Sequence, residues 1–174
     1  MQKEEKNMNS YQNDVMPTNE WFEKIKAHVD FKGKSVVDYG CAEGIMSKLA
    51  KEAGAKYVCA IDNQEHYQPS EGVIFLKADI DERIVYGEIK IFSMIIHWID
   101  KDETLKHIQD CEKAIIIFRE KNPGYQIPIN GKWFPTLDEL DETLDGFRRV
   151  HSELLMVQDN DKRITLAIYE KDLH

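Results

Sequence analysis

The chain has 174 residues and a mass of 20.3 kDa, a length that suits one domain of ordinary size without a separate substrate domain. Its formal net charge of -9 disfavours a broad surface that follows nucleic-acid phosphates. Because no run of 18 apolar residues occurs and the first residues lack the apolar stretch of a signal peptide, we expect no membrane association and a cytoplasmic location. Residues 1–16 are polar and predict a flexible tail, and residues 17–174 predict the single domain.

The three cysteines, Cys41, Cys59 and Cys111, are scattered and show neither a CxxC pair nor a Cys/His spacing. An odd, scattered number predicts reduced thiols and argues against a disulfide framework or a metal site.

Apolar residues recur at helical spacing after Thr18 and predict a short amphipathic helix that ends near Asp30. Five β-type runs follow, each apolar on nearly every residue, as in a parallel sheet that is covered on both faces. These runs are Ser35–Tyr39, Tyr57–Ile61, Val73–Ala78, Ile91–Ile96 and Ala114–Phe118.

Helical stripes separate several of these runs. The stripes are Ile45, Met46, Leu49, Ala50 and Ala53; then Leu105, Ile108 and Cys111; then Leu137, Leu140, Leu144 and Phe147. Only ten residues, Asn63–Gly72, separate the second and third runs, so the helix expected there is a single turn or missing.

Two further β-like runs, His151–Val157 and Ile164–Glu170, are joined by a short polar turn that suits an antiparallel hairpin. The whole pattern predicts an α/β fold: a doubly wound, mostly parallel seven-stranded sheet with a C-terminal antiparallel hairpin, in a three-layer sandwich.

The first run leads into a turn of small residues, Gly40 to Gly44, where a ligand can approach the main chain. A dinucleotide-binding turn of the form GxGxxG would need a third small residue at the position of Ile45. A phosphate-binding P-loop would need a Lys-Ser/Thr pair, and none follows. Both of these interpretations are therefore weakened.

The segment DYGCAEG, residues 38–44, resembles the first motif of class I S-adenosylmethionine-dependent methyltransferases, with Ala42 in place of the central glycine. The resemblance extends from about Trp21 to Glu170. It implies S-adenosyl-L-methionine as the cofactor and S-adenosyl-L-homocysteine as the product. The residues that it assigns to the cofactor in this turn are Asp38, Gly40, Cys41, Ala42 and Gly44.

Carboxylates at the ends of the next two strands extend the implied cofactor site. Asp62, which is 22 positions beyond Gly40, would accept hydrogen bonds from both ribose hydroxyls, with Asn63 beside it. Asp79 would accept from the adenine amino group, and Ile80 would pack on the base. A plain strand-end or helix cap stays open as an alternative for both carboxylates, and the neighbouring Asp81 competes with Asp79.

The acceptor side follows the fourth and fifth strands. His97 is the candidate catalytic base and also a cofactor contact; a histidine bonded to the backbone is the alternative. The long Pro- and Gly-rich connection 121–135 predicts a binding loop, or else a cover for the sheet edge. The candidate substrate contacts are Trp98, Arg119, Tyr125 and Trp133, although Arg119 has a surface pair with Glu120 as its alternative.

The predicted activity is methyl transfer by in-line displacement to a small-molecule acceptor, which we prefer to nucleic acid because the chain is acidic. The sequence lacks the Asn/Asp-Pro-Pro-Tyr motif after the fourth strand, and this argues against methylation of exocyclic amino groups on DNA bases. RNA or protein methylation, and a non-catalytic methyltransferase-like binding module, stay open as alternatives. The sequence does not indicate an oligomeric state.

Overall fold

The computed structural model describes residues 18–64, 67–80, 84–93, 101–120, 135–158 and 162–172. The predicted N-terminal tail, residues 1–16, lies outside these ranges, and the division of the chain into a tail and one domain stays a prediction.

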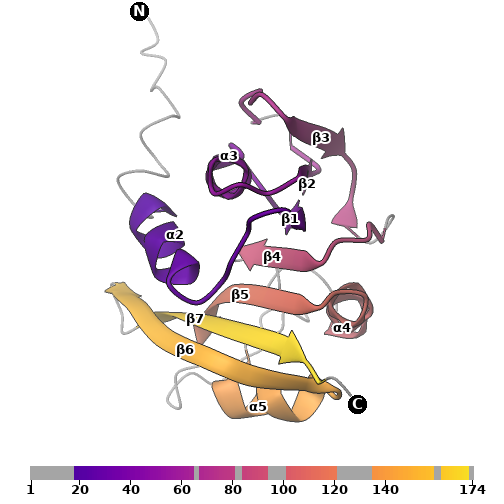
Figure 1. Cartoon of the computed structure of the whole chain (residues 1–174). Coiled ribbons are helices and arrows are strands. Elements are labelled where there is room, and N and C mark those ends of the chain that lie inside the picture. Colours follow the sequence, from indigo (N-terminus) through magenta and orange to yellow (C-terminus); the bar gives the residue numbers. More distant parts are fainter. Residues whose placement is uncertain are drawn as a thin grey trace, which may run out of the picture.

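A seven-stranded mixed sheet forms the centre of the molecule, with the strand order β3-β2-β1-β4-β5-β7-β6 (Figure 1). The pairs within β1 to β5 are parallel, whereas β7 runs antiparallel to both β5 and β6. This arrangement confirms the predicted α/β fold with its C-terminal hairpin. The strands are β1 (Ser35–Tyr39), β2 (Tyr57–Asp62), β3 (Val73–Lys77), β4 (Ile89–Ser93), β5 (Lys113–Glu120), β6 (Phe147–Gln158) and β7 (Lys162–Lys171).

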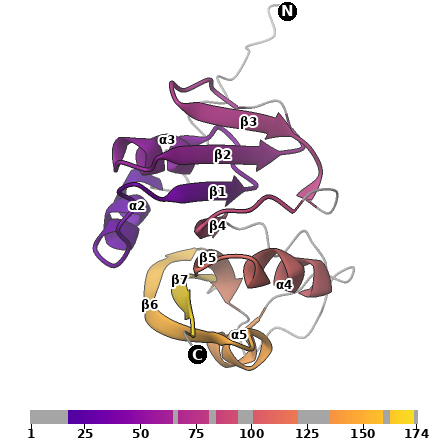
Figure 2. The same cartoon turned by 45° about the vertical axis from the view of Figure 1, so that its right-hand side comes forward.

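Among the described residues, two helices cover each face of the sheet, so this part of the molecule has three layers (Figure 2). On one face lie α2 (Thr18–Lys26) and α3 (Ile45–Glu52); on the other lie α4 (Lys101–Gln109) and α5 (Leu137–Thr143). The apolar stripes drive this packing, since burial of a large apolar side chain contributes about 1.5–3 kcal/mol. No helix in the described ranges is long and apolar enough to span a bilayer.

Several predicted boundaries differ from the structure, and two of the differences have a physical reason. β4 begins at Ile89, two residues before the predicted Ile91. The prediction missed the first two residues because Lys90 interrupts the apolar run in the sequence, although its side chain is fully buried in the structure. The predicted end of that strand, residues 94–96, lies outside the described residues. The first helix ends at Lys26 and not near Asp30, although Val29 still packs into the same core.

Phe147 was predicted to lie in a helical stripe, and this was wrong. α5 ends at Thr143, Gly146 turns the chain with a φ of 78°, and Phe147 becomes the first residue of β6. Phe147 nevertheless packs against the same apolar cluster as Leu140 and Leu144, which explains why its spacing resembled that of a helix.

The two connections that leave β2 and β3 are short. The described residues between β2 and β3, and those between β3 and β4, contain no α-helix. The expected loss of the first of these helices is confirmed for that part of the chain. As a result, the face of β2 and β3 on the side of α4 has no helix over it in the described structure (Figures 1 and 2).

Candidate functional site

The turn that follows β1 lies where the strand order reverses. β1 pairs with β2 on one side and with β4 on the other, so the connections on its two sides lead in opposite directions. In open parallel sheets, ligands bind beyond the carboxyl ends of the strands at this point. Residues 40–44 are therefore placed where the sequence predicts a ligand.

The turn has a left-handed backbone at three alternate residues. The φ angles are 69° at Gly40, 47° at Ala42 and 81° at Gly44. Ala42 is the single non-glycine residue with a positive φ among the residues that the structure describes. The N–H groups of Gly40 and Cys41 both donate to the Ile61 carbonyl, at 2.8 and 3.1 Å, so the turn is bonded directly to β2.

The carboxylate of Asp62 joins the turn to the end of β2. One oxygen, Oδ2, accepts the N–H of Ala42 at 2.8 Å, and the other, Oδ1, accepts the N–H of Gln64 at 2.8 Å. An ionised carboxylate oxygen has two lone pairs, so each oxygen keeps capacity for another donor, such as a hydroxyl group. Asp62 therefore caps the backbone locally and can still accept hydrogen bonds from a ligand.

Asn63 and Asp79 meet across the ends of β2 and β3. The Nδ2 group of Asn63 donates to Oδ1 of Asp79 at 2.7 Å, and both side chains are exposed. The sequence placed these residues at neighbouring strand ends, and the structure brings them into contact. Ile80, in contrast, is buried in the apolar cluster on the α4 face.

Asp38 is a fully buried carboxylate behind the turn. Its Oδ2 atom accepts a hydrogen bond from the Ser47 hydroxyl at 2.5 Å, whereas Oδ1 has no hydrogen-bond partner in the described structure. Burial raises the pKa of Asp38 to about 7, although the bond from Ser47 works in the opposite direction. An orphaned buried oxygen of this kind suits a ligand that brings a positive charge or a donor close to it.

The sequence did not reveal the role of Ser47. This residue lies nine positions after Asp38 within an apolar helical stripe, and its side chain is fully buried. One signal was available in the sequence. Ser47 is a small polar residue on the buried face of a helix, and that helix follows a strand whose end carries an acidic residue.

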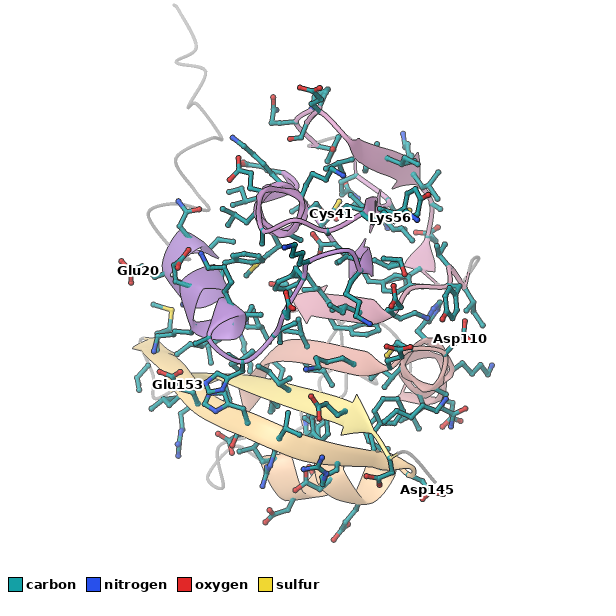
Figure 3. All side chains as sticks on the ribbon, in the orientation of Figure 1. Glu20, Cys41, Lys56, Asp110, Asp145 and Glu153 are labelled. Atoms are coloured by element: carbon teal, nitrogen blue, oxygen red, sulfur yellow. The ribbon has the colours of Figure 1, made fainter. Side chains whose placement is uncertain are left out.

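Cys41 lies in the turn beside α3 and is 7% exposed (Figure 3). Burial, together with the nearby carboxylates of Asp38 and Asp62, raises the pKa of its thiol. The thiol therefore stays protonated and is unsuited to act as a nucleophile.

Tyr67 lies directly over Gly44, a contact that the sequence did not indicate. A Cβ atom on Gly44 would come within 2.4 Å of the Cε2 atom of Tyr67. The Tyr67 ring also stacks on Phe75 of β3, with centroids 4.5 Å apart, and the N–H of Gln68 donates to the Glu43 carbonyl. Gly44 therefore makes room for the short β2–β3 connection, in addition to its left-handed backbone.

On the opposite face, the end of β1 is fixed by a second buried group. The Tyr39 hydroxyl accepts the N–H of Val85 at 3.1 Å and lies 3.3 Å from Nδ1 of His107. Lys90 donates to the His107 carbonyl at 2.7 Å, which links β4 to α4. Burial lowers the pKa of Lys90 and raises that of Tyr39 to about 12. These contacts hold the strand end from which the turn departs.

The acceptor side is only partly described. Arg119 is a half-buried residue of β5, and its neighbour Glu120 accepts the Thr165 hydroxyl at 3.1 Å and lies 3.6 Å from Nε of Arg163. The other predicted residues of this side lie outside the described ranges: His97, Trp98, Tyr125 and Trp133.

Comparisons with known proteins identify a family for this chain. The FtsJ-like methyltransferase family matches residues 19–120, which include β1 to β5, the turn and the carboxylates at the ends of β2 and β3. The ribosomal protein arginine N-methyltransferase rmt3 of Schizosaccharomyces pombe is 35% identical over 71 residues. These residues are 40% of this chain and 13% of that relative, so the chain matches only a small part of the relative's length.

Two solved structures share the fold. An S-adenosylmethionine dependent methyltransferase from Mesorhizobium loti has a TM-score of 0.68 at 18% identity, over 87% of this chain and 97% of that chain. The magnesium protoporphyrin IX methyltransferase of Synechocystis PCC 6803, with bound SAH, has a TM-score of 0.63 at 17% identity, over 91% and 82% of the two chains.

The family match covers more than half of the chain and contains the turn whose motif predicted a class I methyltransferase. The observed seven-stranded mixed sheet, with its antiparallel β6–β7 pair, is the fold that the sequence predicted. The chain therefore belongs to the FtsJ-like methyltransferase family.

Proposed function

We propose that this protein is an S-adenosylmethionine-dependent methyltransferase that acts on a small-molecule acceptor by in-line displacement. The observation that carries the proposal is the left-handed turn bonded to Asp62 through the Ala42 N–H at 2.8 Å, with the buried Asp38 behind it. Membership of the FtsJ-like methyltransferase family supports it. The cofactor, when bound, supplies a methyl group that is already activated on a sulfonium.

The residues of this chain would bind and orient the cofactor. Asp62 would accept hydrogen bonds from the ribose hydroxyls through the free lone pairs of its two oxygens. Asp79, held by Asn63, would accept from the adenine amino group. Asp38 would favour positive charge near the turn. The remaining proposed contacts are Gly40, Cys41, Ala42, Gly44, Ile80 and His97.

Positioning would supply much of the catalysis. Orientation alone can lower a barrier by about 7–11 kcal/mol in favourable systems, so a dedicated base is not essential. His97 is our candidate for a base if the acceptor must lose a proton. Trp98, Arg119, Tyr125 and Trp133 are the proposed acceptor contacts.

The preference for a small molecule over nucleic acid rests on charge. The chain carries a formal charge of -9, which opposes a broad polyanion-binding surface. We place the protein in the cytoplasm because Cys41, Cys59 and Cys111 are all unbridged, as expected in a reducing compartment.

A basic protein segment is the second candidate acceptor. A groove of 640 Å³ runs between α2 and α3, and its lining contains three carboxylates and one ammonium group. Glu20, one of these carboxylates, lies on the outer side of α2 (Figure 3). The relative rmt3 is named for a ribosomal protein acceptor. The residues that line the groove are Asn19, Glu20, Glu23, Ile45, Lys48, Leu49 and Glu52.

Calorimetric titration with S-adenosylmethionine, S-adenosylhomocysteine and NAD tests the cofactor. We expect both methyl-cycle compounds to bind, and Asp62→Ala to weaken each at least about tenfold, because it removes charge-assisted hydrogen bonds. Asp145→Ala, at an exposed carboxylate away from the turn, is the matched control and should bind as the unmodified chain does (Figure 3). Binding of NAD with no response to either methyl-cycle compound would refute the proposal.

The acceptor is tested with labelled methyl donor and a cell extract divided into a small-molecule filtrate, protein and RNA. Label in the filtrate, lost in Asp62→Ala, supports the small-molecule acceptor. Label in basic proteins, reduced by Glu20→Lys and Glu23→Lys, supports the second candidate. Cofactor binding without transfer to any fraction would favour a non-catalytic binding module.

A further inference from the structure

Among the described residues, one edge of the sheet combines an edge strand that has no outer partner with an apolar face that no helix covers. β3 is the last strand on its side, and its pairing with β2 has no interruption in register. On the face towards α4, Ile74 is 62% exposed and Tyr57 of β2 is 61% exposed. Ile74 lies opposite Cys59, two residues from Tyr57, so the two exposed side chains share a face. Exposed apolar edges of this kind are sites of strand addition.

The other edge of the sheet differs. β6 also carries an exposed apolar residue, Val157, at 57%. However, its pairing with β7 shifts register twice, between Arg149 and His151 and between Leu154 and Met156. Bulges twist an edge strand and protect it from pairing. β3 has no such protection in its described length.

The backbone of β3 determines which registers a new strand can adopt. The N–H of Ala78 donates to the Asp62 carbonyl at 3.1 Å, so the even-numbered residues of β3 direct their backbone groups towards β2. Backbone groups alternate in direction along a strand, and Val73, Phe75 and Lys77 therefore direct theirs outward. A second β3 strand can pair antiparallel in register only where outward residues face each other.

Charge distinguishes the two central registers of this kind. If the two-fold axis passes Ile74, then Val73 faces Phe75 of the second copy, and the turn with Glu71 comes beside Lys77. If the axis passes Phe75, then Lys77 faces Val73, and the Glu71 turn comes beside Asp79, so that like charges approach. Opposite charges across a strand pair stabilise it and like charges destabilise it, which selects the register centred on Ile74.

We propose that two copies of this chain associate through β3, antiparallel and centred on Ile74, so that their sheets become continuous. Each Ile74 packs on its counterpart on the uncovered face, with Tyr57 beside it. Glu71 of each copy pairs with Lys77 of the other. A two-fold interface uses the same patch on both subunits, so each favourable pair occurs twice.

Light scattering after size exclusion, over a range of protein concentrations, measures the association. We expect a dimer with a dissociation constant in the micromolar range, because the interface is small. Ile74→Lys should abolish the dimer, since it places two ammonium groups opposite each other. Val157→Lys, at a similarly exposed apolar residue on the bulged edge, is the matched control and should leave the dimer intact.

A charge exchange tests the register. Glu71→Lys alone and Lys77→Glu alone should each weaken the dimer about tenfold, because two attractive pairs become repulsive. An equimolar mixture of the two variants should form a heterodimer of normal strength, since both of its pairs are again opposite in sign. The double variant in one chain should likewise recover.

Three outcomes would overturn the proposal. These are a monomer at every concentration, a dimer that survives Ile74→Lys, or variants that weaken the dimer without recovery in the mixture. Circular dichroism spectra and melting temperatures of each variant separate loss of association from loss of the fold.

Discussion

Ala42 has a backbone conformation that an L-residue adopts only at a cost. Its φ of 47° lies in the left-handed region, which costs a non-glycine residue about 1–2 kcal/mol. Ala42→Gly removes that cost but adds freedom to the unfolded chain, so we expect a gain of about 0.5–1 kcal/mol in the free energy of unfolding. Chemical denaturation measures it.

Ala53→Gly is the control for this substitution. Ala53 has an ordinary φ of -74°, so glycine there should lower the free energy of unfolding by about 0.5–1 kcal/mol. If both glycine variants lose stability equally, the left-handed turn is not strained.

The buried Asp38 makes stability depend on pH. Its pKa rises from 3.8 to about 7 on folding, so the stability that neutral Asp38 contributes is fully present below about pH 4 and is lost as the pH rises to about 7. Asp38→Asn cannot ionise. We therefore expect the free energy of unfolding of Asp38→Asn, relative to the unmodified chain, to increase by up to about 4 kcal/mol between pH 4 and pH 7.

Urea denaturation of the two proteins at several pH values between 4 and 8 gives this difference. Above about pH 7.5 the two curves should run parallel, because Asp38 is then ionised in both the folded and unfolded states. A constant difference across the whole range would show that Asp38 does not titrate on folding.

At the scale of single residues, the sequence predicted positions better than contacts. Asp62 and Asp79 could be placed at strand ends because each follows a recognisable apolar run. Ser47 and Tyr67 could not be found in this way, since their roles depend on long-range contacts with Asp38 and Gly44. A short polar connection carries no periodicity that indicates where its aromatic residue will pack.

Among the elements, the short β2–β3 connection depends on one glycine. Gly44→Ala would place a Cβ atom 2.4 Å from the Tyr67 ring and would force alanine to a φ of 81°. We expect the free energy of unfolding to fall by about 2–4 kcal/mol. In the double variant Gly44→Ala/Tyr67→Ala, the loss of stability should be smaller than the sum of the two single losses by about 1 kcal/mol or more. The reason is that Tyr67→Ala removes the overlap with the new Cβ atom but not the backbone cost.

Gly146→Ala separates the two contributions. Gly146 has a similar φ of 78°, but a Cβ atom there would meet nothing within 4 Å. Gly146→Ala should therefore lower the free energy of unfolding only by the cost of the left-handed backbone, about 1–2 kcal/mol. Equal losses at Gly44 and Gly146, with additive effects of Tyr67→Ala, would contradict the packing role of Tyr67.

The predicted boundaries of elements were wrong where the burial of a residue does not follow from its polarity. Lys90 interrupts an apolar run, yet its ammonium group finds the His107 carbonyl and its side chain is fully buried. Local composition cannot show that a lysine has a buried acceptor on another element. The same limit applies to Phe147, which contacts the α5 cluster from a strand.

For the whole molecule, the two halves of the sheet should differ in local stability. β1, β4 and β5 are central, whereas the connections that leave β2 and β3 contain no α-helix in the described residues. We expect amide hydrogens of β3 to exchange fastest among the strands, and those of β5 slowest. Hydrogen–deuterium exchange at a protein concentration below the expected dissociation constant of the proposed dimer measures the rates. Exchange in β3 as slow as in β5 would contradict this.

The fold as a whole was more predictable than its details. Alternating β-type and helical patterns determine a doubly wound sheet, because few right-handed connections satisfy them. The final pair, β6 and β7, was predicted from a polar turn between two apolar runs. The insertion of β7 between β5 and β6 was not predicted, since spacing alone does not determine which strand of a hairpin joins the sheet.

That insertion has a consequence for synthesis of the protein. β5 contains five consecutive residues, Ala114–Phe118, that are fully buried, and its outer edge is completed only by β7, more than 40 residues later in the chain. A nascent chain therefore carries an open, very apolar strand until β7 has left the ribosome. Chains that stop before Lys162 should sediment with aggregates in a cleared lysate, and a chaperone that binds extended apolar segments should keep them in the supernatant.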